Sequence, residues 1–153
     1  MNMRARIGVG MSVMVAVAMA VPCAVAQDWP QWRGPSRDGA VTGFTVPASW
    51  PTGLNEQWSV EVGFGYASPI LIGDHVYMFA RQGDDEVMMA LDAGSGETVW
   101  RTSYPAPFEM MAATRNHGPG PKSTPAYADG RLFTLGISGI VTAFDAETGG
   151  QLW

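Results

Sequence analysis

The 153-residue chain has a single cysteine and few charged residues. One cysteine excludes a disulfide framework and a cysteine-rich zinc site. Charged residues make up 15% of the chain, well below the roughly 25% of an average soluble domain. The net charge is −5, and because cationic side chains are what bind phosphates, we do not expect a nucleic-acid partner.

The chain beyond residue 26 also lacks the apolar spacing of an amphipathic helix, at i, i+3, i+4 and i+7. It contains instead many turn-forming residues, with 19 glycines and 11 prolines in the whole chain, and 6 tryptophans. Turn residues that separate short apolar segments predict many short strands. We therefore expect the mature chain to be all-β.

The first 26 residues have the organisation of a secretory signal peptide. Arg4 and Arg6 precede a long uncharged stretch, which ends in Ala24-Val25-Ala26, the small-x-small pattern that signal peptidase cleaves. Cleavage after Ala26 removes two of the 9 cationic residues and the only cysteine, and it leaves all 14 acidic ones, for a net charge of −7. We expect an exported protein, periplasmic or extracellular, without a stable membrane span.

Two alternatives to cleavage after Ala26 stay open. The apolar stretch is about long enough to span a bilayer, so an uncleaved anchor is one of them. Lipid attachment at Cys23 is the other, although Pro22 directly before it is unfavourable for a lipoprotein site.

Two segments of the chain repeat each other. Ala90–Trp100 and Ala143–Trp153 both read Ala-x-Asp-x-x-[Ser/Thr]-Gly-x-x-x-Trp, at an offset of 53 residues. Upstream of each, Ser68–Tyr77 matches Thr124–Phe133 as a short apolar strand, a Gly/Asp turn and a second apolar strand. A third, partial copy lies at Leu54–Trp58.

Turns recur within each copy at strand spacing, and three turns that join four antiparallel strands make one propeller blade. We therefore predict two four-stranded blades, at residues 63–103 and 123–153, the second of them truncated. A leader with a possible closing strand, residues 27–62, precedes the first blade. An irregular insertion rich in proline and glycine, residues 104–122, separates the two.

The element that ends each copy is predicted to be structural. Its members are Asp92, Gly96 and Trp100 in the first copy, and Asp145, Gly149 and Trp153 in the second. The aspartate accepts hydrogen bonds from backbone N–H groups two or three residues on, and the glycine adopts a positive φ. The tryptophan ring then packs against the neighbouring blade while its N–H donates to a backbone acceptor.

This element resembles the tryptophan-docking motif of the pyrroloquinoline-quinone (PQQ) repeat propellers, the quinoprotein-type or PQQ-binding-like family, with Ser95 where threonine is usual. Asp28–Gly39 and Asn116–Pro125 also resemble segments of secreted bacterial members. The resemblance implies a partial β-propeller whose partners are further blades or other proteins. A closed propeller has at least about four blades, so we expect an N-terminal fragment or truncated product that needs partner copies for stability.

The resemblance leaves the function open between two classes. Some family members bind no quinone and act as scaffolds, which favours a non-catalytic binding or scaffold module. The alternative is the N-terminal part of a PQQ-dependent dehydrogenase that oxidises an alcohol or sugar with PQQ and Ca²⁺, and a metal-assisted hydrolase is a third. No residue here matches the family's metal or base positions, so we assign no catalytic or metal-binding residue and leave the cofactor unknown.

The predicted insertion carries the candidates for ligand binding. These are Arg115, Asn116, His117 and Lys122, in a segment without a strand pattern, where loops of a propeller often carry function.

Two further polar features are assigned no ligand. The acidic run Asp84-Asp85-Glu86 lacks the ligand spacing of a calcium loop, so we expect a solvated hairpin tip. His75, beside a hairpin turn, is expected to be an exposed turn residue.

Overall fold

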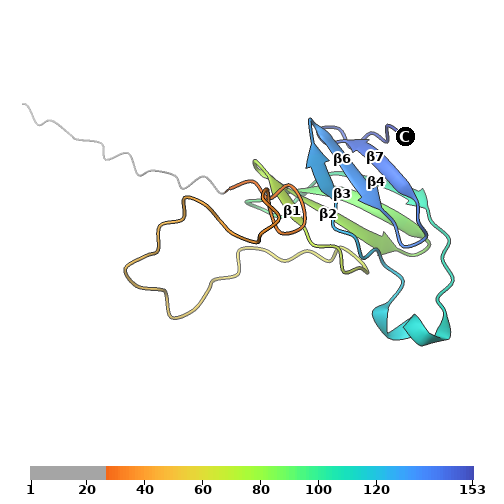
Figure 1. Cartoon of the computed structure of the whole chain (residues 1–153), viewed down its shortest axis with the longest axis horizontal. Coiled ribbons are helices and arrows are strands. Elements are labelled where there is room, and N and C mark those ends of the chain that lie inside the picture. The colour runs from red at the N-terminus through yellow and green to blue at the C-terminus, as the bar shows by residue number, and fades with distance from the viewer. Residues whose placement is uncertain (1–26) are drawn as a thin grey trace, which may run out of the picture.

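The computed structural model describes residues 27–153. The signal peptide and the lipid anchor at Cys23, both predicted on residues 1–26, lie outside the described residues. One sheet contains four antiparallel strands in sequence order: β1 (Ile70–Ile72), β2 (His75–Gln82), β3 (Asp85–Asp92) and β4 (Thr98–Pro105). A second sheet contains β5 (Ala126–Ala128), β6 (Arg131–Leu135) and β7 (Val141–Asp145) (Figure 1). The all-β expectation is confirmed.

Tight turns join the strands within each sheet. Gly73 and Asp74 connect β1 to β2, and Asp129 and Gly130 connect β5 to β6. Asp129 and Gly130 both have a positive φ, 48° and 75°, which is what the twist of a two-residue hairpin requires. The up-and-down order of strands in each sheet is therefore set by short local turns.

The two sheets pack against each other as successive blades do in a propeller. Ile70, Phe79 and Met88 of the first sheet and Leu132 and Phe144 of the second belong to one buried cluster, each with at most 1% of its surface exposed. A separate cluster on the first sheet centres on β3 residues that face away from the second sheet. Burial of both faces of the first sheet explains why β3 is apolar almost throughout.

Tryptophan docking joins the sheets at the turn that follows the third strand. The Trp100 indole N–H donates to the Ala146 carbonyl at 3.1 Å, and its ring lies so close to Gly149 that an added Cβ there would be 2.5 Å from the ring. Gly149 has a φ of 72°. The Asp145 carboxylate accepts from the backbone N–H of Thr148 at 2.8 Å and thereby closes the turn.

The same arrangement occurs one blade earlier. The Trp58 indole N–H donates to the Ala93 carbonyl at 3.0 Å, and its ring covers Gly96, whose φ is 75°. Asp92 accepts from the backbone N–H of Ser95 at 2.8 Å. The partial sequence copy at Leu54–Trp58 therefore contributes a docked tryptophan to the first blade.

Two details of the prediction need correction. A 3₁₀ helix, η1 (Ala112–His117), lies in the insertion that we expected to be irregular, because six residues are too few to leave a helical period in the sequence. The second sheet has three strands and not four. Gln151, Leu152 and Trp153 stand where Thr98, Val99 and Trp100 begin β4, and they make one bridge, Phe144↔Gln151, and two backbone bonds to Ala143.

The leader crosses the inner strands of both blades. Trp29 forms an antiparallel bridge with Leu71 of β1, with N–H···O distances of 2.7 and 3.1 Å. The neighbouring Pro30 carbonyl accepts from Tyr127 N–H of β5 at 2.8 Å. Residues 27–62 contain no longer strand in the structure, so the closing strand stays a prediction, as do the exact blade boundaries. Among residues 27–153, no helix is long and apolar enough to cross a membrane.

Trp100→Ala is expected to lower the free energy of unfolding by roughly 3–5 kcal/mol, because it empties the space over Gly149 and leaves the Ala146 carbonyl with one donor fewer. Trp153→Ala is the matched control. The Trp153 ring is 60% exposed and contacts the Phe133 ring at 6.2 Å, so its loss should cost less than about 1 kcal/mol. Urea denaturation of the two variants measures the difference, and equal losses would contradict the docking role.

Candidate functional site

The connection between β4 and β5 lies at one end of the two blades (Figure 1). It is anchored where it leaves the first sheet, since Ala106 N–H donates to the Asp84 carbonyl at 3.0 Å and the buried Arg81 donates to the Ala106 carbonyl at 2.8 Å. It is anchored again before β5, where the Pro121 carbonyl accepts from Tyr66 N–H at 2.8 Å. The segment between these anchors contains η1 and is largely exposed, and we call it the cover.

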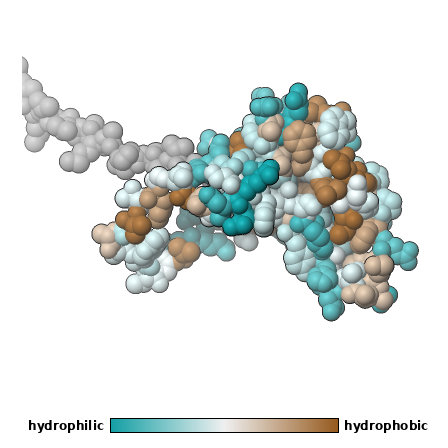
Figure 2. Space-filling view, viewed as in Figure 1, coloured by the Kyte–Doolittle hydropathy of each residue, from teal (hydrophilic) through white to brown (hydrophobic). Residues whose placement is uncertain are grey.

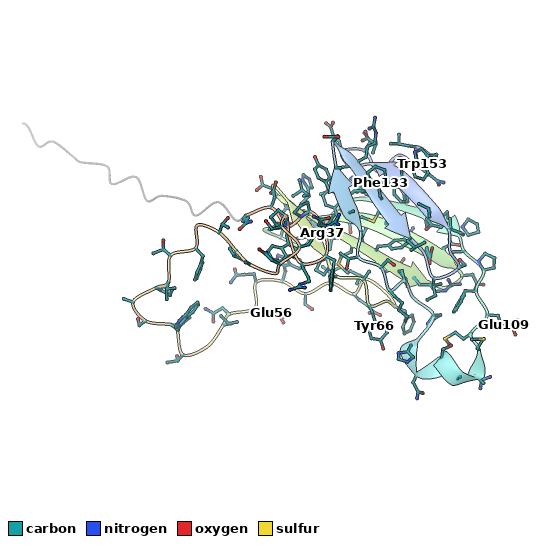
Figure 3. All side chains as sticks on the ribbon, viewed as in Figure 1. Arg37, Glu56, Tyr66, Glu109, Phe133 and Trp153 are labelled. Atoms are coloured by element: carbon teal, nitrogen blue, oxygen red, sulfur yellow. The ribbon has the colours of Figure 1, made fainter. Side chains whose placement is uncertain are left out.

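A cavity of about 420 Å³ lies between this cover and the second sheet. Phe108, Met111 and Ile137 supply its apolar walls, with Thr114 and Gly118 beside them. We call this space the insertion cavity. Figure 3 shows the residues of this end, where Tyr66 and Glu109 are labelled below the two sheets.

Three polar side chains line the insertion cavity besides Thr114: Glu109, His117 and Lys122. The Lys122 ammonium donates to the carbonyl oxygens of His117 and Gly118, the latter at 3.2 Å. It also lies 4.2 Å from the centroid of the Tyr66 ring, a cation–π distance. Two backbone carbonyl oxygens and an aromatic ring thus surround the cation.

The structure brings together two of the four loop candidates from the sequence. His117 and Lys122 line the insertion cavity. Arg115 and Asn116 lie in η1 with exposed side chains and are not part of the lining. The sequence analysis did not identify the apolar walls of the cavity. One of them, Ile137, could have been found, because an apolar residue beside the Ser138-Gly139 turn is unexpected at a solvated tip.

The acidic run in the β2–β3 hairpin needs a correction, since its members lie in opposite environments. The Asp84 side chain is fully exposed, as expected of a hairpin tip. Glu86 is fully buried. Its carboxylate accepts from Ile137 N–H at 2.6 Å and from the Tyr104 hydroxyl at 2.9 Å, and an added Cβ at Gly136 would collide with it.

The position of Glu86 has a consequence for the insertion cavity. Ile137 belongs to the turn between β6 and β7 in the second sheet, while Glu86 belongs to β3 in the first. A buried carboxylate needs such partners, because an unpaired charge in the interior is very costly. One wall of the cavity is therefore positioned by a hydrogen bond that crosses between the sheets.

Tyr104 shares this buried environment. Burial raises the pKa of Tyr104 to about 12; the Thr142 hydroxyl opposes the shift, and the hydrogen bond and negative charge of Glu86 add to it. At the other end of the sheets, the hydrogen bonds from Ser95 lower the pKa of Asp92, and those from Thr148 lower the pKa of Asp145.

The second cavity between the sheets lies at the docking end. It has a volume of about 350 Å³ and is lined by His75, Tyr77 and Asp145 among others. The Tyr77 hydroxyl donates to the Ala146 carbonyl at 3.1 Å, and burial raises the Tyr77 pKa, with smaller contributions from Tyr127 and Asp145. His75 is half-buried here rather than exposed.

The donor chemistry of the insertion cavity does not fit a calcium–quinone pair. Ca²⁺ takes six to eight oxygen ligands, several of them carboxylates. The cavity offers one carboxylate, Glu109, and among residues 27–153 no three His, Cys, Asp or Glu side chains come together as a metal site. We derive no chemical step through PQQ or Ca²⁺ from these residues.

Comparison with known proteins relates the repeats to one group of sequences. Residues 83–153 match the family model PQQ_2, described as "Outer membrane protein assembly factor BamB". The BamB of Shewanella oneidensis is 38% identical over 64 residues, which cover 42% of this chain and 16% of that protein. The BamB of Burkholderia pseudomallei is 28% identical over 129 residues, and the match covers 65% of this chain and 33% of that protein.

Solved structures give weaker matches. A europium-containing methanol dehydrogenase matches with a TM-score of 0.42 at 25% identity, over 59% of this chain and 15% of that one. BamB from Moraxella catarrhalis matches with a TM-score of 0.41 at 21% identity, over 63% and 29%. The chain spans between a sixth and a third of the length of the curated relatives it matches.

The stability of the fold should fall as the pH rises from about 10 to about 12, because the native state keeps a proton on Tyr104 that the unfolded chain has already lost. The loss in the free energy of unfolding that is due to Tyr104 should be roughly 1–2 kcal/mol over this range. Urea titrations at pH 9 and pH 11.5 measure it, with Tyr104→Phe as the reference, since phenylalanine has no proton to lose. If the variant loses as much stability over this range as the parent, the buried phenol does not contribute.

Proposed function

The repeats of this chain belong to the PQQ-like β-propeller family, and we propose that the chain is an exported, non-catalytic scaffold or binding module that assembles with other proteins. The observation that carries the proposal is the match of residues 83–153 to the BamB family model. BamB is by its name an outer membrane protein assembly factor.

The surface supports a protein partner. Residues 39–55 carry no charge, and they include five exposed large apolar side chains: Val41, Phe44, Val46, Trp50 and Leu54. This loop projects from the sheets and shows hydrophobic colour in the space-filling view (Figures 1 and 2). Large exposed apolar surfaces of this kind mark interaction sites.

Two contacts order the loop, one with Gln27 before it and one within it. Gln27 accepts from the Thr42 N–H at 2.8 Å, and Phe44 and Trp50 stack with their ring centroids 6.1 Å apart. At its far end, docked Trp58 fixes the chain on the first blade. The loop can thus present its apolar side chains from a fixed base, which reduces the entropy lost on binding.

Export is the second component of the proposal. Its support is the small-x-small pattern that ends at Ala26 and the acidic character of the chain that follows. Export would bring the module to the compartment in which outer membrane proteins are assembled.

Site-specific crosslinking in the cells that produce the protein tests the scaffold role. A photoreactive benzophenone side chain at Trp50 should give a discrete protein adduct. The same group at Glu97, an exposed position in a docking turn, is the matched control and should give none. Equal yields at both positions, or no adduct at either, would contradict a partner on this loop.

A quinone assay tests the catalytic alternative. The exported protein, supplied with PQQ and Ca²⁺, should show neither quinone absorbance after desalting nor dye-linked oxidation of alcohols or sugars. A PQQ-dependent dehydrogenase of established activity, assayed in parallel, provides the positive control. Retention of quinone with turnover would overturn the non-catalytic proposal in favour of a dehydrogenase.

A further inference from the structure

The insertion cavity has the size and lining of a small-molecule site. Its volume of about 420 Å³ lies within the range of ligand pockets, roughly 300–1,000 Å³. Phe108, Met111 and Ile137 are its apolar lining residues. One aromatic, one unbranched and one branched side chain together suit a ring or a branched chain. A ligand bound against these side chains would remove their apolar surface from water, which favours binding.

A positive charge stands at this cavity. An ammonium group has three N–H donors. The Lys122 ammonium donates to two carbonyl oxygens, and the Tyr66 ring lies on another side of it. Lys122 is exposed, so it is still accessible to a ligand. The chain as a whole has a net charge of −5. A cation beside apolar walls therefore differs from the rest of the surface, and it favours binding of a ligand that has an anionic group.

The cavity is also pre-formed. Ile137 is held by the bond from its N–H to buried Glu86. The insertion is held by Gly120, which lies so close to the Phe64 carbonyl that no side chain fits there. A site that is already ordered loses little entropy on binding. Glu109, the one carboxylate of the lining, is exposed and would repel a second negative charge.

We propose that the insertion cavity binds a small amphiphilic anion, with an aromatic or branched apolar body against Phe108, Met111 and Ile137 and a single carboxylate or sulfonate on Lys122. Binding is reversible and involves no covalent step. The inference goes beyond the scaffold role and does not depend on it, because the partner loop at residues 39–55 shares no residue with this cavity.

Fluorescence titration with 1-anilinonaphthalene-8-sulfonate tests the apolar part on the whole chain. Ile137→Trp fills the cavity and should raise the Kd for the probe about tenfold or more. Val141→Trp is the matched control, since Val141 is an exposed apolar residue of the neighbouring strand β7 and is not part of the lining. A Kd changed equally in both variants would overturn the site.

The charge is tested by comparing this probe with its neutral analogue, N-phenyl-1-naphthylamine. Lys122→Met should weaken binding of the anion about tenfold and leave the neutral analogue nearly unchanged, and Lys122→Arg should restore most of the anion's affinity. Equal losses for both probes would overturn the role of Lys122.

A competition assay keeps the test decisive if Lys122→Met unfolds. Benzoate should compete with the probe on the parent protein, whereas benzyl alcohol should not. Competition by both small molecules alike would show that charge plays no part and would overturn the proposal.

Discussion

The contact on which this structure depends is a tryptophan ring lying flat over a glycine of the next sheet. Gly149 has a positive φ and no side chain, so the Trp100 ring can approach the backbone while its N–H reaches the Ala146 carbonyl. The Thr102 hydroxyl adds a bond to the Gly149 carbonyl at 2.7 Å. One turn of the second blade is thus held by two side chains of β4, and the distance between the blades is set there.

The other end of the blades is set by a polar contact. The Glu86 carboxylate joins β3 to the turn at Ile137, and the Tyr104 hydroxyl completes its shell. Buried carboxylates contribute little net stability, but they are costly in any arrangement that leaves them unpaired. The docked tryptophan favours contact between the blades. Glu86 favours one position of the second blade relative to the first, at the end that holds the insertion cavity.

The docking element could be predicted because it is local. Aspartate, glycine and tryptophan occur within nine residues of one another, and the turn chemistry of Asp92 and Gly96 follows from residue type alone. The second copy at Asp145 made the pattern recognisable as a blade, and even the partial copy at Trp58 docks in the same way. These features need no knowledge of distant contacts.

The insertion cavity could not be predicted in the same way. Its walls join Phe108 to Ile137, which are far apart in sequence, and no periodic pattern links them. The burial of Glu86 could not be predicted, because Asp84 two residues earlier lies at the exposed hairpin tip and the burial depends on where the second blade lies. His117 and Lys122 were found only because their segment lacks a strand pattern; their joint position at a cavity is a tertiary result.

A double-mutant cycle tests most directly the claim that the ring of Trp100 over Gly149 joins the blades. The free energy of unfolding would be measured for Trp100→Ala, Gly149→Ala and the double variant, and again with Gly96→Ala, which faces Trp58, in place of Gly149→Ala. We expect a coupling energy of about 1 kcal/mol or more with Gly149 and additive effects with Gly96. Additive effects in both cycles, or equal coupling in both, would contradict the account.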